Sequence, residues 1–389
     1  MTKRKITIMY FVSGLISGGV ERMIANWTQK LDNREYEFIV VYQHKAVTQC
    51  LKMIEESGCH AIRITARNEN FIKNMVDSYR VIRLYHPDIV HSNMNLMNFC
   101  ALLPAKLMNI KVRICHSHIA DKKTNYLYRL LEKIFRLLNN MSSTINMACG
   151  EDAAKYLFGK KISAISLQEA VNYFKTGQNI RFGKNNVIIV NNAIDFEQFS
   201  YVKDNFRNWY NLQEKIIIGH VGRFTEQKNQ KRLLEIFCEY RKSHENAVLL
   251  IAGTGELKEQ LEKYVNELEI VESVIFLGVL EDMKAFYSSI DILLLPSLYE
   301  GFPVVALEIQ AAGKPALFSD QIDSSSKITD LVHFVSLKKS NSDWAKAIDY
   351  VLKSYNNIDF KHELTAAGYN INEEIKKLDY LYRQFIKNI

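Results

Sequence analysis

The chain has 389 residues, of which 48% are hydrophobic and 24% charged, with only 5 prolines. This length predicts two domains of about 100–200 residues each, and the composition excludes a disordered or low-complexity protein. The net charge of +7 is uneven, because residues 1–190 carry 27 Lys and Arg against 14 Asp and Glu, whereas the remaining residues carry 23 against 29. The basic first half suits an anionic partner, either acidic lipid or nucleic acid, unless it is only a solvated surface.

The N-terminal segment MTKRKITIMYFVSGLISGG imitates a secretion signal, because basic residues precede an apolar run of about ten residues. That run is rich in β-branched and aromatic residues, as in a buried strand. Apolar residues then recur at helical spacing, at Met23, Trp27 and Leu31. We therefore predict a strand and a helix here. No apolar run approaches the roughly 18 residues needed to cross a bilayer, so a soluble or peripheral protein is expected.

Short apolar strands alternate with amphipathic helices along the chain, as expected for parallel sheets built from βαβ units. The sequence predicts an α/β fold of two Rossmann-like domains, residues 1–195 and 196–370. The strands expected in the first domain are 5–14, 37–43, 61–65, 88–93, 111–118, 144–150 and 186–194. Those expected in the second domain are 215–224, 247–255, 274–280 and 291–297, with helices at 229–243 and 256–269.

Ligands of open parallel sheets bind at the carboxyl ends of the strands. This rule selects most of the unusual polar and glycine residues, which we expect to line one cleft between the domains. They are Gly14 to Gly19, His91, His116, His118, Arg223 to Lys228, Gly253, Gly255 and Glu300.

The segment SLYEGFPVVALEIQAAGKP (297–315) places two carboxylates at the start of an apolar helix. Pro303 suits the first helical position, so the N–H groups of residues 301–304 are expected to be free. Glu300 lies just outside the helix, and the Glu308 side chain leans back toward its start. Two carboxylates repel phosphate but accept hydrogen bonds from sugar hydroxyls. The alternative is one acidic residue favoured by the helix dipole and another on a solvated face.

Arg223 and Lys228 follow a predicted strand end, where an arginine fork and a lysine could bind a diphosphate. Glycine pairs that allow close approach of backbone follow two other strands, at Gly18 and Gly19 and at Gly253 and Gly255. Neither pair fits the G-x-G-x-x-G pattern, which counts against a nicotinamide-dependent dehydrogenase.

Six cysteines occur without any C-x-x-C pair, mostly in apolar segments, so buried free thiols in a reducing compartment are expected. Cys115, His116 and His118 suggest a metal site only weakly, because no further ligands stand at characteristic spacing. His116 and His118 share one side of an extended segment. A hydrogen-bonding group at the substrate is the favoured interpretation, and a purely structural histidine is the alternative.

Residues 121–140, DKKTNYLYRLLEKIFRLLNN, predict a basic amphipathic helix. Such a helix either lies against the headgroups of an anionic membrane or packs in the core with a basic rim. The pattern leaves both interpretations open.

Seven segments in chain order resemble the retaining nucleotide-sugar glycosyltransferases of family 4, whose GT-B fold has two facing Rossmann-like domains. The segments are GGVER (18–22), PDIVHSN (87–93), RICHSH (113–118), NNAID (191–195), VGRFTEQKN (221–229), IAGTGEL (251–257) and EGFPVVALE (300–308). The last looks like the family's E-x7-E signature, and RICHSH looks most like the enzymes that assemble capsular polysaccharides and exopolysaccharides. Ala193 stands where the family usually has glycine.

The resemblance implies a donor site in which Glu308 holds the ribose and Glu300 faces the transferred sugar or its phosphate. Arg223 and Lys228 would bind the diphosphate. The implied donor-binding set also includes Gly18, Gly19, Gly253, Gly255, Gly301, Phe302, Pro303 and Val304. No metal ion or other cofactor is implied, because basic residues and helix dipoles stabilise the leaving diphosphate.

The resemblance also implies that His118 lies beside the transferred sugar, as a catalytic group together with Glu300, Arg223 and Lys228. The acceptor side would include Gly18, Gly19, His91 and His116. A final helix over 371–389 resembles one that returns to the first domain in this family. Residues 160–184 are interpreted as an unusually long loop that could carry acceptor specificity.

The sequence therefore predicts a metal-independent retaining glycosyltransferase at the cytoplasmic face of the membrane. It would move one sugar from a nucleotide-sugar, with uridine as the expected base, to a lipid-linked oligosaccharide in the synthesis of a surface polysaccharide. A sugar-nucleotide 2-epimerase with the same fold and a non-catalytic carbohydrate-binding or partner-binding chain remain open. Nucleic-acid binding is not expected, because no recognised module appears and the basic residues are dispersed.

Overall fold

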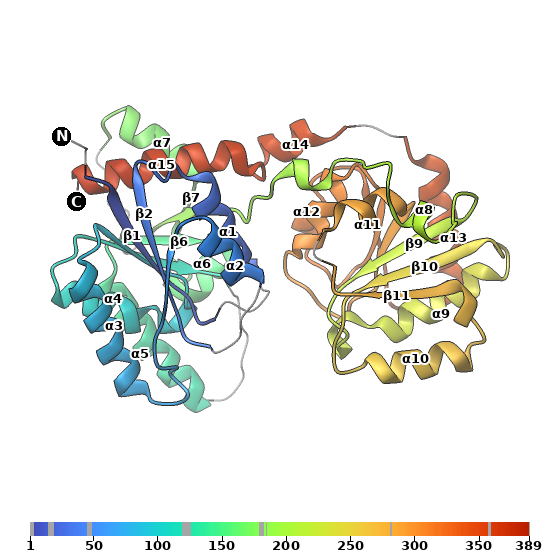
Figure 1. Ribbon diagram of the computed structural model, residues 1–389, viewed down its shortest axis with the longest axis horizontal. Coiled ribbons are helices and arrows are strands. Elements are labelled where there is room, and N and C mark those ends of the chain that lie inside the picture. Colours follow the sequence, from blue (N-terminus) through green and yellow to red (C-terminus); the bar gives the residue numbers. More distant parts are fainter. Residues whose placement is uncertain are drawn as a thin grey trace. The chain divides into compact units, whose positions relative to one another are not determined.

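The computed structural model describes residues 4–14, 19–44, 49–118, 126–178, 183, 185–280, 282–356 and 359–388. The chain forms two compact units (Figure 1). Unit 1 comprises Met1–Ala193 together with Ile371–Ile389, and unit 2 comprises Ile194–Asn370. The boundaries expected from the sequence were residues 195 and 370.

Unit 1 is built on an eight-stranded parallel sheet with the strand order β3-β2-β1-β4-β5-β6-β8-β7. Every predicted strand of the first domain is present, which confirms the alternating pattern. The strands are β1 (Ile6–Phe11), β2 (Tyr36–Tyr42), β3 (His60–Arg63), β4 (Ile89–Ser92), β5 (Val112–Ser117), β6 (Ile145–Ala148), β7 (Ser163–Ser166) and β8 (Asn186–Ile189).

Helices cover both faces of this sheet. Successive residues of β1 point to opposite faces, so Ile8 and Tyr10 join one apolar cluster while Met9 and Phe11 join the other. The first cluster is covered by α1 (Gly19–Lys30), α2 (Gln49–Glu56), α7 (Leu167–Lys175) and α15 (Ile371–Asn388). The second is covered by α3 (Phe71–Tyr85), α4 (Phe99–Leu107), α5 (Tyr126–Ser142) and α6 (Glu151–Phe158).

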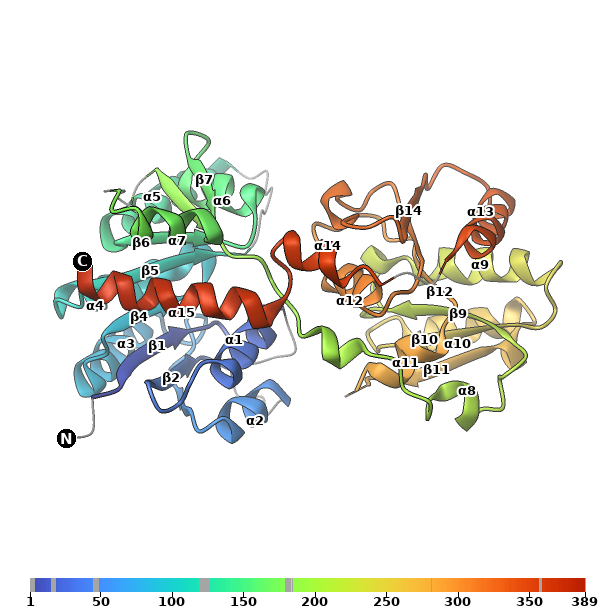
Figure 2. The same ribbon diagram turned by 90° about the horizontal axis from the view of Figure 1, so that it is seen from above.

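Helix α15 comes from the end of the chain but belongs to unit 1, where it contacts α7 and α1 (Figure 2). Its buried face includes Leu378, Leu381 and Phe385. At its edge, Tyr36 Oη donates a 2.6 Å hydrogen bond to the carboxylate of Asp379. The same helix therefore completes the core of a sheet that begins more than 360 residues earlier.

The interpretation of residues 160–184 as a loop was wrong, because this segment contains strand β7 and helix α7. Ser166 caps α7 by accepting from the backbone N–H of Glu169, whose carboxylate in turn accepts from the backbone N–H of Ser166. Leu167, Ala170 and Val171 are then buried at helical spacing. The S-x-x-E pattern was the local signal that should have revealed the helix.

Unit 2 contains a six-stranded parallel sheet with the strand order β11-β10-β9-β12-β13-β14. One face is covered by α8 (Phe206–Trp209), α11 (Lys284–Ser289), α12 (Val304–Ala311) and α14 (Lys361–Ala366). The other is covered by α9 (Gln230–Arg241), α10 (Lys258–Glu267) and α13 (Asn341–Ser354). The strands are β9 (Ile216–Val221), β10 (Ala247–Ala252), β11 (Val274–Gly278), β12 (Ile292–Leu295), β13 (Ala316–Ser319) and β14 (Val332–Val335).

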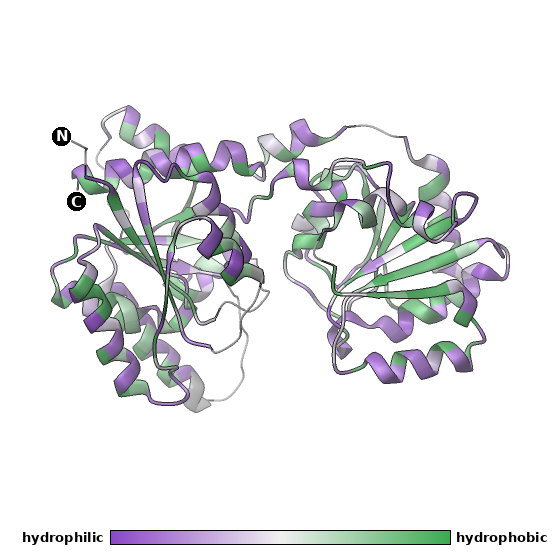
Figure 3. Cartoon of the chain, in the orientation of Figure 1, coloured by the Kyte–Doolittle hydropathy of each residue, from purple (hydrophilic) through white to green (hydrophobic). Residues whose placement is uncertain are grey.

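The four strands expected in this unit are confirmed, whereas β13 and β14 were not predicted. Each is four residues long and apolar at three positions, as is the predicted strand β6, so their apolar pattern was present but was not recognised. The other strands and helices were predicted from their hydrophobic patterns. Figure 3 shows these patterns, with strands that are mostly hydrophobic and helices that carry both hydrophobic and hydrophilic residues.

Two further findings concern the described residues as a whole. No described helix combines the length and the apolar character that crossing a membrane requires. Four of the six free cysteines are buried as expected, but Cys149 and Cys238 are partly exposed.

Candidate active site

A buried ion pair lies beyond the carboxyl edge of the unit 2 sheet. Lys228 Nζ donates to Glu300 Oε2 at 2.5 Å, and the side chains are 18% and 8% exposed. Ser297 Oγ donates to the other carboxylate oxygen of Glu300 at 2.5 Å. Both oxygens of Glu300 are therefore engaged by the protein. The sequence selected Lys228 and Glu300 separately, and the structure brings them together.

Hydrogen bonds between two loops hold this ion pair in position. Leu298 N, in the loop after β12, donates a 2.8 Å hydrogen bond to Gln227 O in the loop after β9. Asn229 Nδ2 donates at 2.9 Å to Pro296 O across the same two loops. Asn229 adopts a left-handed conformation, with φ of 55°, and this lets α9 start immediately after the Lys228 turn. These bonds connect the loop that carries Lys228 to the loop that carries Glu300.

The backbone around Glu300 is also paired, which fixes the start of the E-x7-E segment. Glu300 N donates to Gln321 O at 3.3 Å, and Glu300 O accepts from Asp323 N at 3.1 Å. The next residue, Gly301, is exposed and has no neighbouring atom within 4 Å of the position a Cβ would take. Phe302 stacks on Tyr369 at a centroid distance of 5.2 Å.

Helix α12 begins at Val304, one residue later than expected, because Pro303 is its N-cap. The Pro303 carbonyl accepts from Ala306 N at 2.9 Å, and no side chain caps the helix. A proline at this position still leaves the first N–H groups of the helix without an intrahelical acceptor. One turn along the helix, Glu308 is partly exposed and accepts a 2.6 Å hydrogen bond from Tyr287 Oη.

Gly253 and Gly255 have a structural reason to be glycine. A Cβ on Gly253, whose φ is 136°, would lie 2.0 Å from Gly222 O, and one on Gly255 would lie 2.4 Å from Phe224 O. The two glycines therefore let the loop after β10 contact the loop after β9 backbone to backbone. Phe224 N donates to Thr254 O at 2.9 Å within this contact.

Arg223 stands apart from the buried ion pair. Its side chain is 78% exposed, and it approaches the carboxylate of Glu256 only at 3.7 Å. A surface pair at this distance contributes little to stability and does not hold the guanidinium in one place. Arg223 is therefore available to an anion.

Sequence reasoning missed the polar layer beneath these loops. His220, within β9, is fully buried, and its Nδ1 lies 2.9 Å from Leu294 O. Gln230 Nε2 lies 3.3 Å from His220 Nε2 and donates to Arg223 O at 3.0 Å. Burial lowers the pKa of His220 to about 4. The signal that could have found it is a histidine within an otherwise apolar buried strand.

The three histidines of unit 1 lie together at the carboxyl ends of β4 and β5. His91 Nε2 and His116 Nδ1 are 3.0 Å apart, and the ring centroids of His116 and His118 are 4.0 Å apart. His91 and His116 have no exposed surface, whereas His118 is partly exposed. His118 Nε2 bonds to Asn93 Oδ1 at 2.9 Å. Only His118 of the three therefore reaches the surface.

These histidines are neutral at pH 7. Burial lowers the pKa of His91 and of His116 well below the usual value and lowers the pKa of His118 to about 3. Among the described residues, no group of three or more His, Cys, Asp or Glu side chains is arranged to hold a metal ion. The cluster is therefore a set of uncharged hydrogen-bonding groups.

The predicted glycine site near the start of α1 is only partly described. Gly19 is the first residue of α1 and is exposed, while Gly18 lies outside the described residues. Gly14 ends the first described segment, with the His44 ring close to the position a Cβ would take.

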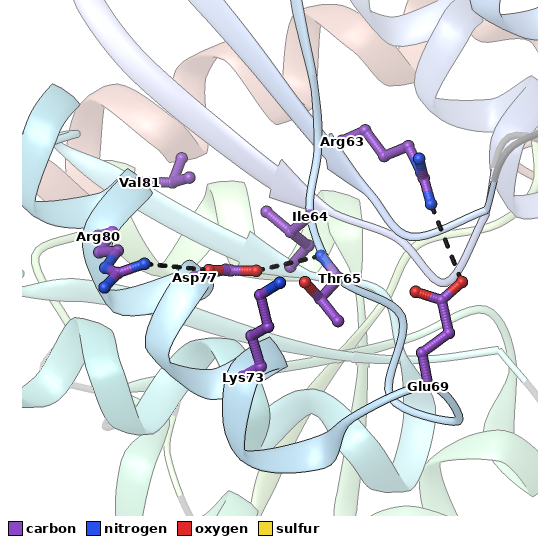
Figure 4. A pocket seen from close by; sticks show the side chains of 8 residues that line it. All are labelled: Arg63, Ile64, Thr65, Glu69, Lys73, Asp77, Arg80 and Val81. Carbon is purple, nitrogen blue, oxygen red and sulfur yellow. Dashed lines mark hydrogen bonds and ion pairs between the residues drawn. The ribbon is translucent and has the colours of Figure 1, made fainter.

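A separate open cavity of about 690 Å³ lies between β3 and α3 in unit 1. Figure 4 shows that opposite charges already meet there. Arg63 and Glu69 approach to 3.9 Å, and Arg80 approaches Asp77 to 3.7 Å. Asp77 also accepts a hydrogen bond from Thr65 N at 3.3 Å. The Asp77 carboxylate therefore already has partners within the protein. No predicted site residue lines this cavity.

The predicted helix at residues 121–140 corresponds to α5, although Lys122 and Lys123 lie outside the described residues. Phe135 packs inward against Phe99 at a centroid distance of 5.2 Å. Other apolar residues of the helix face outward and are 41% to 59% exposed. They are Leu130, Leu131, Ile134, Leu137 and Met141. The interpretation as an ordinary core helix therefore does not account for this side of α5.

Comparison with known proteins identifies two family matches, one in each unit. Residues 17–163 match Glycosyltransferase Family 4, and residues 202–371 match Glycosyl transferases group 1. A relative from Methanocaldococcus jannaschii, an uncharacterized glycosyltransferase, is 30% identical over 275 residues, covering 63% of this chain and 67% of the relative.

Other relatives align over most of the chain. One from Bacillus subtilis (strain 168), named as the glycosyltransferase EpsF, is 28% identical over 359 residues, covering 90% of this chain and 88% of that protein. A galactosyltransferase of Escherichia coli, named for UDP-Gal and GlcNAc-diphosphoundecaprenol, is 21% identical, covering 82% of this chain and 80% of its own length.

Solved structures support the same fold. The structure of Anabaena HepE in complex with UDP has a TM-score of 0.74 at 12% identity and covers 98% of this chain and 100% of that chain. A glycosyltransferase from Rickettsia africae has a TM-score of 0.73 at 16% identity and covers 100% of both chains. The two parallel sheets with flanking helices confirm the predicted GT-B class. The chain belongs to the glycosyltransferases, with a family 4 match in unit 1 and a group 1 match in unit 2.

Proposed function

We propose that this glycosyltransferase moves one sugar from a nucleotide-sugar, with UDP as the nucleotide, to a lipid-linked oligosaccharide during synthesis of a surface polysaccharide. The observation that carries the proposal is the arrangement at the carboxyl edge of unit 2. There the Lys228–Glu300 pair precedes an uncapped helix that bears Glu308. The HepE complexes with UDP and with UDP-glucose support a uridine nucleotide. The named substrate of the Escherichia coli relative supports a lipid diphosphate acceptor.

The chemistry that we propose follows from the groups available at this edge. Glu308 accepts from hydroxyls of the ribose, while Arg223, Lys228 and the free N–H groups of α12 bind the diphosphate as negative charge develops on it. Lys228 can donate to a phosphate oxygen without leaving Glu300, because an ammonium group has three donors. Such an arrangement needs no divalent cation, and we propose transfer with retention of configuration.

The first test is a thermal-shift screen of the purified protein in EDTA against UDP, GDP, ADP and their sugars. A ligand at 100 times its Kd should stabilise the protein by about 2.7 kcal/mol, which raises Tm clearly. Stabilisation by uridine nucleotides alone supports the proposed donor. A requirement for added Mg²⁺ or Mn²⁺ contradicts metal independence.

The second test removes the proposed ligands one at a time. Glu308→Ala and Lys228→Ala should each reduce transfer from the UDP-sugar by at least about 100-fold, since each removes a charged hydrogen bond to the proposed donor. Glu272→Ala, an exposed change at the amino end of β11, is the matched control and should retain activity. Wild-type activity in either site variant contradicts the assignment.

Product analysis separates transfer from the alternatives. Sugar attached to a lipid-linked acceptor supports the proposal, and the configuration of the new bond decides retention. An epimerised UDP-sugar formed without acceptor indicates a 2-epimerase instead. Binding of the UDP-sugar with neither hydrolysis nor transfer indicates a non-catalytic chain.

We also propose that the outer side of α3, α4 and α5 lies on an anionic membrane, which would bring unit 1 to a lipid-linked acceptor at its inner face. Helix α4 packs between α3 and α5, so the three form one layer. Besides the apolar side chains of α5, the layer exposes Ile72, Leu84 and Leu107, each at least 68% exposed. Apolar residues that are interleaved with cations are typical of surfaces that bind acidic lipid.

The charges of this layer favour lipid over a second copy of the chain. Its described helices carry seven basic residues against two acidic ones, Asp77 and Glu132. The basic residues are Lys73, Arg80, Arg83, Lys106, Arg129, Lys133 and Arg136. Two copies meeting through this surface would place like charges together, whereas an anionic bilayer complements them.

Cosedimentation with vesicles tests this proposal. Binding to phosphatidylcholine vesicles that contain phosphatidylglycerol should exceed binding to pure phosphatidylcholine and should fall with added salt. The double change Ile134→Ser and Leu137→Ser should weaken binding, whereas Tyr350→Ser, at an exposed aromatic of unit 2, should not. Equal loss in both variants, or a dimer in solution that the α5 changes dissociate, contradicts the membrane assignment.

A further inference from the structure

Arg67 follows strand β3 and is held by the loops that follow the central strands of unit 1. Its Nη2 donates to Ser13 Oγ at 3.0 Å, beyond β1, and its Nη1 donates to Met94 Sδ at 2.9 Å, beyond β4. The backbone N–H of Arg67 donates to Gln43 Oε1 at 3.3 Å, and Gln43 Nε2 donates to the same sulfur at 3.0 Å. Residues from the loops after β1, β2 and β4 therefore fix the position of one guanidinium group.

These bonds place Arg67 where the order of the strands in the sheet reverses. In the order β3-β2-β1-β4-β5, the chain proceeds outward from β1 on one side and from β4 on the other. The helices that follow these two strands, α1 and α4, cover opposite faces of the sheet. The region between two such loops is where open α/β sheets bind their ligands. Arg67 bonds to one residue of each loop, so its guanidinium lies at this switch point.

The positive charge of Arg67 has no counter-charge in the described part of the chain. Both side-chain acceptors of its hydrogen bonds are uncharged, and a thioether is a weak acceptor. The acidic residues closest to it along the α3 side, Glu69 and Asp77, approach Arg63 and Arg80 instead. Because an unpaired charge that is partly withdrawn from water is unfavourable, an anion bound here would offset that cost.

Partial burial does not neutralise this group as it neutralises the nearby histidines. Burial lowers the pKa of Arg67 below its usual value, but an arginine side chain keeps its proton at pH 7. The Cys100 thiol also influences this pKa, and it is itself neutral at pH 7 because burial raises its pKa to about 11. Arg67 is therefore a fixed cation beside uncharged groups.

The groups that remain free at this position are hydrogen-bond donors. An arginine side chain has more N–H donors than the two bonds to Ser13 and Met94 use. Ser13 Oγ accepts from Arg67, so its own O–H is left to donate. Arg67 and Ser13 are both partly exposed, which gives a ligand access to them.

We propose that Arg67 and Ser13 bind a phosphate group at the switch point of the unit 1 sheet, and that this group belongs to the diphosphate of the acceptor. A phosphate carries negative charge, has oxygens that accept from several donors, and matches the planar fork of arginine. The Escherichia coli relative named for GlcNAc-diphosphoundecaprenol supports a lipid diphosphate. The assignment to an acceptor rests on the proposed function, whereas the phosphate site does not.

Calorimetric titration with inorganic pyrophosphate tests the phosphate site. Arg67→Met removes the charge and should weaken binding at this site about tenfold or more. Arg63→Met is the matched control, because Arg63 ends the same strand and pairs with Glu69 only at 3.9 Å, and it should bind as the wild type does. The proposed donor residues of unit 2 are the same in all three proteins. Equal binding in Arg67→Met and the wild type overturns the proposal, as does acetate that binds as tightly as pyrophosphate.

Thermal unfolding without ligand separates a binding role of Arg67 from a structural one. Arg67→Met removes an unpaired, partly buried charge, so its Tm should equal or exceed that of the wild type. A lower Tm in Arg67→Met than in Arg63→Met overturns the proposal, since the bonds to Ser13 and Met94 would then serve the fold. Arg67→Lys keeps the charge but not the planar fork, so it should weaken pyrophosphate binding less than Arg67→Met does.

Farnesyl diphosphate, farnesol and UDP identify the source of the phosphate. Arg67→Met should raise the Kd of farnesyl diphosphate about tenfold or more, while the Kd of UDP and of farnesol should not change. An equal change for UDP overturns the assignment to the acceptor, and an equal change for farnesol overturns the phosphate contact. If UDP does not bind the wild type, the proposed donor is wrong, and farnesyl diphosphate still decides whether Arg67 binds a lipid diphosphate.

Discussion

At the carboxyl edge of the unit 2 sheet the important side chains are charged, whereas the histidine cluster at the carboxyl edge of the unit 1 sheet is neutral. Lys228 and Glu300 neutralise each other at 2.5 Å, and the more exposed Arg223 remains available to an anion. In unit 1, His91 and His116 are fully buried and joined only by hydrogen bonds to uncharged groups. Burial without a counter-charge removes the charge from a titratable group, while a close counter-charge preserves it.

This difference fits two kinds of ligand chemistry. Mobile or paired cations suit a diphosphate whose negative charge grows during transfer. Neutral hydrogen-bonding groups suit hydroxyl groups, which carry no charge. Both edges lie at the ends of parallel strands, so the fold supplies the position and the surrounding residues decide the chemistry.

The largest expected effect on stability comes from breaking the buried ion pair. Lys228→Met leaves Glu300 with Ser297 as its side-chain partner and should lower the free energy of unfolding by about 3–5 kcal/mol, as for other buried pairs that lose one member. The double variant Lys228→Met and Glu300→Gln should recover most of this loss, because no charge is left unpaired. Urea unfolding measures both. Equal stability of the single and double variants would mean that Glu300 is adequately solvated without lysine.

A smaller effect is expected from the glycine that joins the two loops of unit 2. Gly255→Ala forces a Cβ against the backbone of Phe224 and should destabilise the protein by about 1–3 kcal/mol. Gly301→Ala is the control, because nothing lies near its Cβ position, and its effect should stay within about 0.5 kcal/mol. Similar values for the two variants in urea unfolding would contradict the close contact between the loops.

A further prediction concerns how the neutral histidines make the free energy of unfolding depend on pH. The pKa of His118 is lowered to about 3 and that of His220 to about 4, whereas an unfolded histidine titrates near pH 6.5. Below about pH 6.5 the unfolded chain therefore binds more protons, and the free energy of unfolding falls as the pH falls. Each such histidine adds up to about 1.4 kcal/mol per pH unit to this slope.

Three histidines with a lowered pKa lie in unit 1 and two, His220 and the partly buried His333, lie in unit 2, so acid should weaken unit 1 more. Hydrogen exchange of the strand amides at pH 7 and pH 5, corrected for intrinsic rates, would measure the two units separately. His220→Gln should reduce the pH dependence of the free energy of unfolding in unit 2 but not in unit 1. Equal acid sensitivity of the two units would contradict the contrast between them.

Much of the fold was predictable because the local sequence pattern indicates where strands and helices form. Most strands of both sheets were recognised from apolar runs, since a strand covered on both faces is expected to be continuously hydrophobic, but β7, β13 and β14 were not. Strands β13 and β14 were missed although three of the four residues in each are apolar, as in β6, which was recognised. Helix α7 was missed although its capping box was legible at Ser166 and Glu169.

The sequence selected candidate site residues one by one but did not reveal which of them contact each other. The rule that ligands bind at strand ends selected Lys228, Glu300, His116 and His118 from the sequence. Nothing in the local spacing revealed that Lys228 would pair with Glu300, which lies 72 positions away. The supporting groups His220 and Gln230 were not selected at all, because they are buried within regular elements and resemble core positions.

The sequence by itself determined the two parallel sheets and the residues at their ends, because strand and helix periods depend on neighbours along the chain. Only the tertiary structure decided which polar groups meet, including Tyr382 and His91 at a separation of 291 positions. The physical reason is that a buried hydrogen bond or ion pair depends on distance in space and on the exclusion of water. Both are set by the packing of the helices, including α15, on the finished sheets.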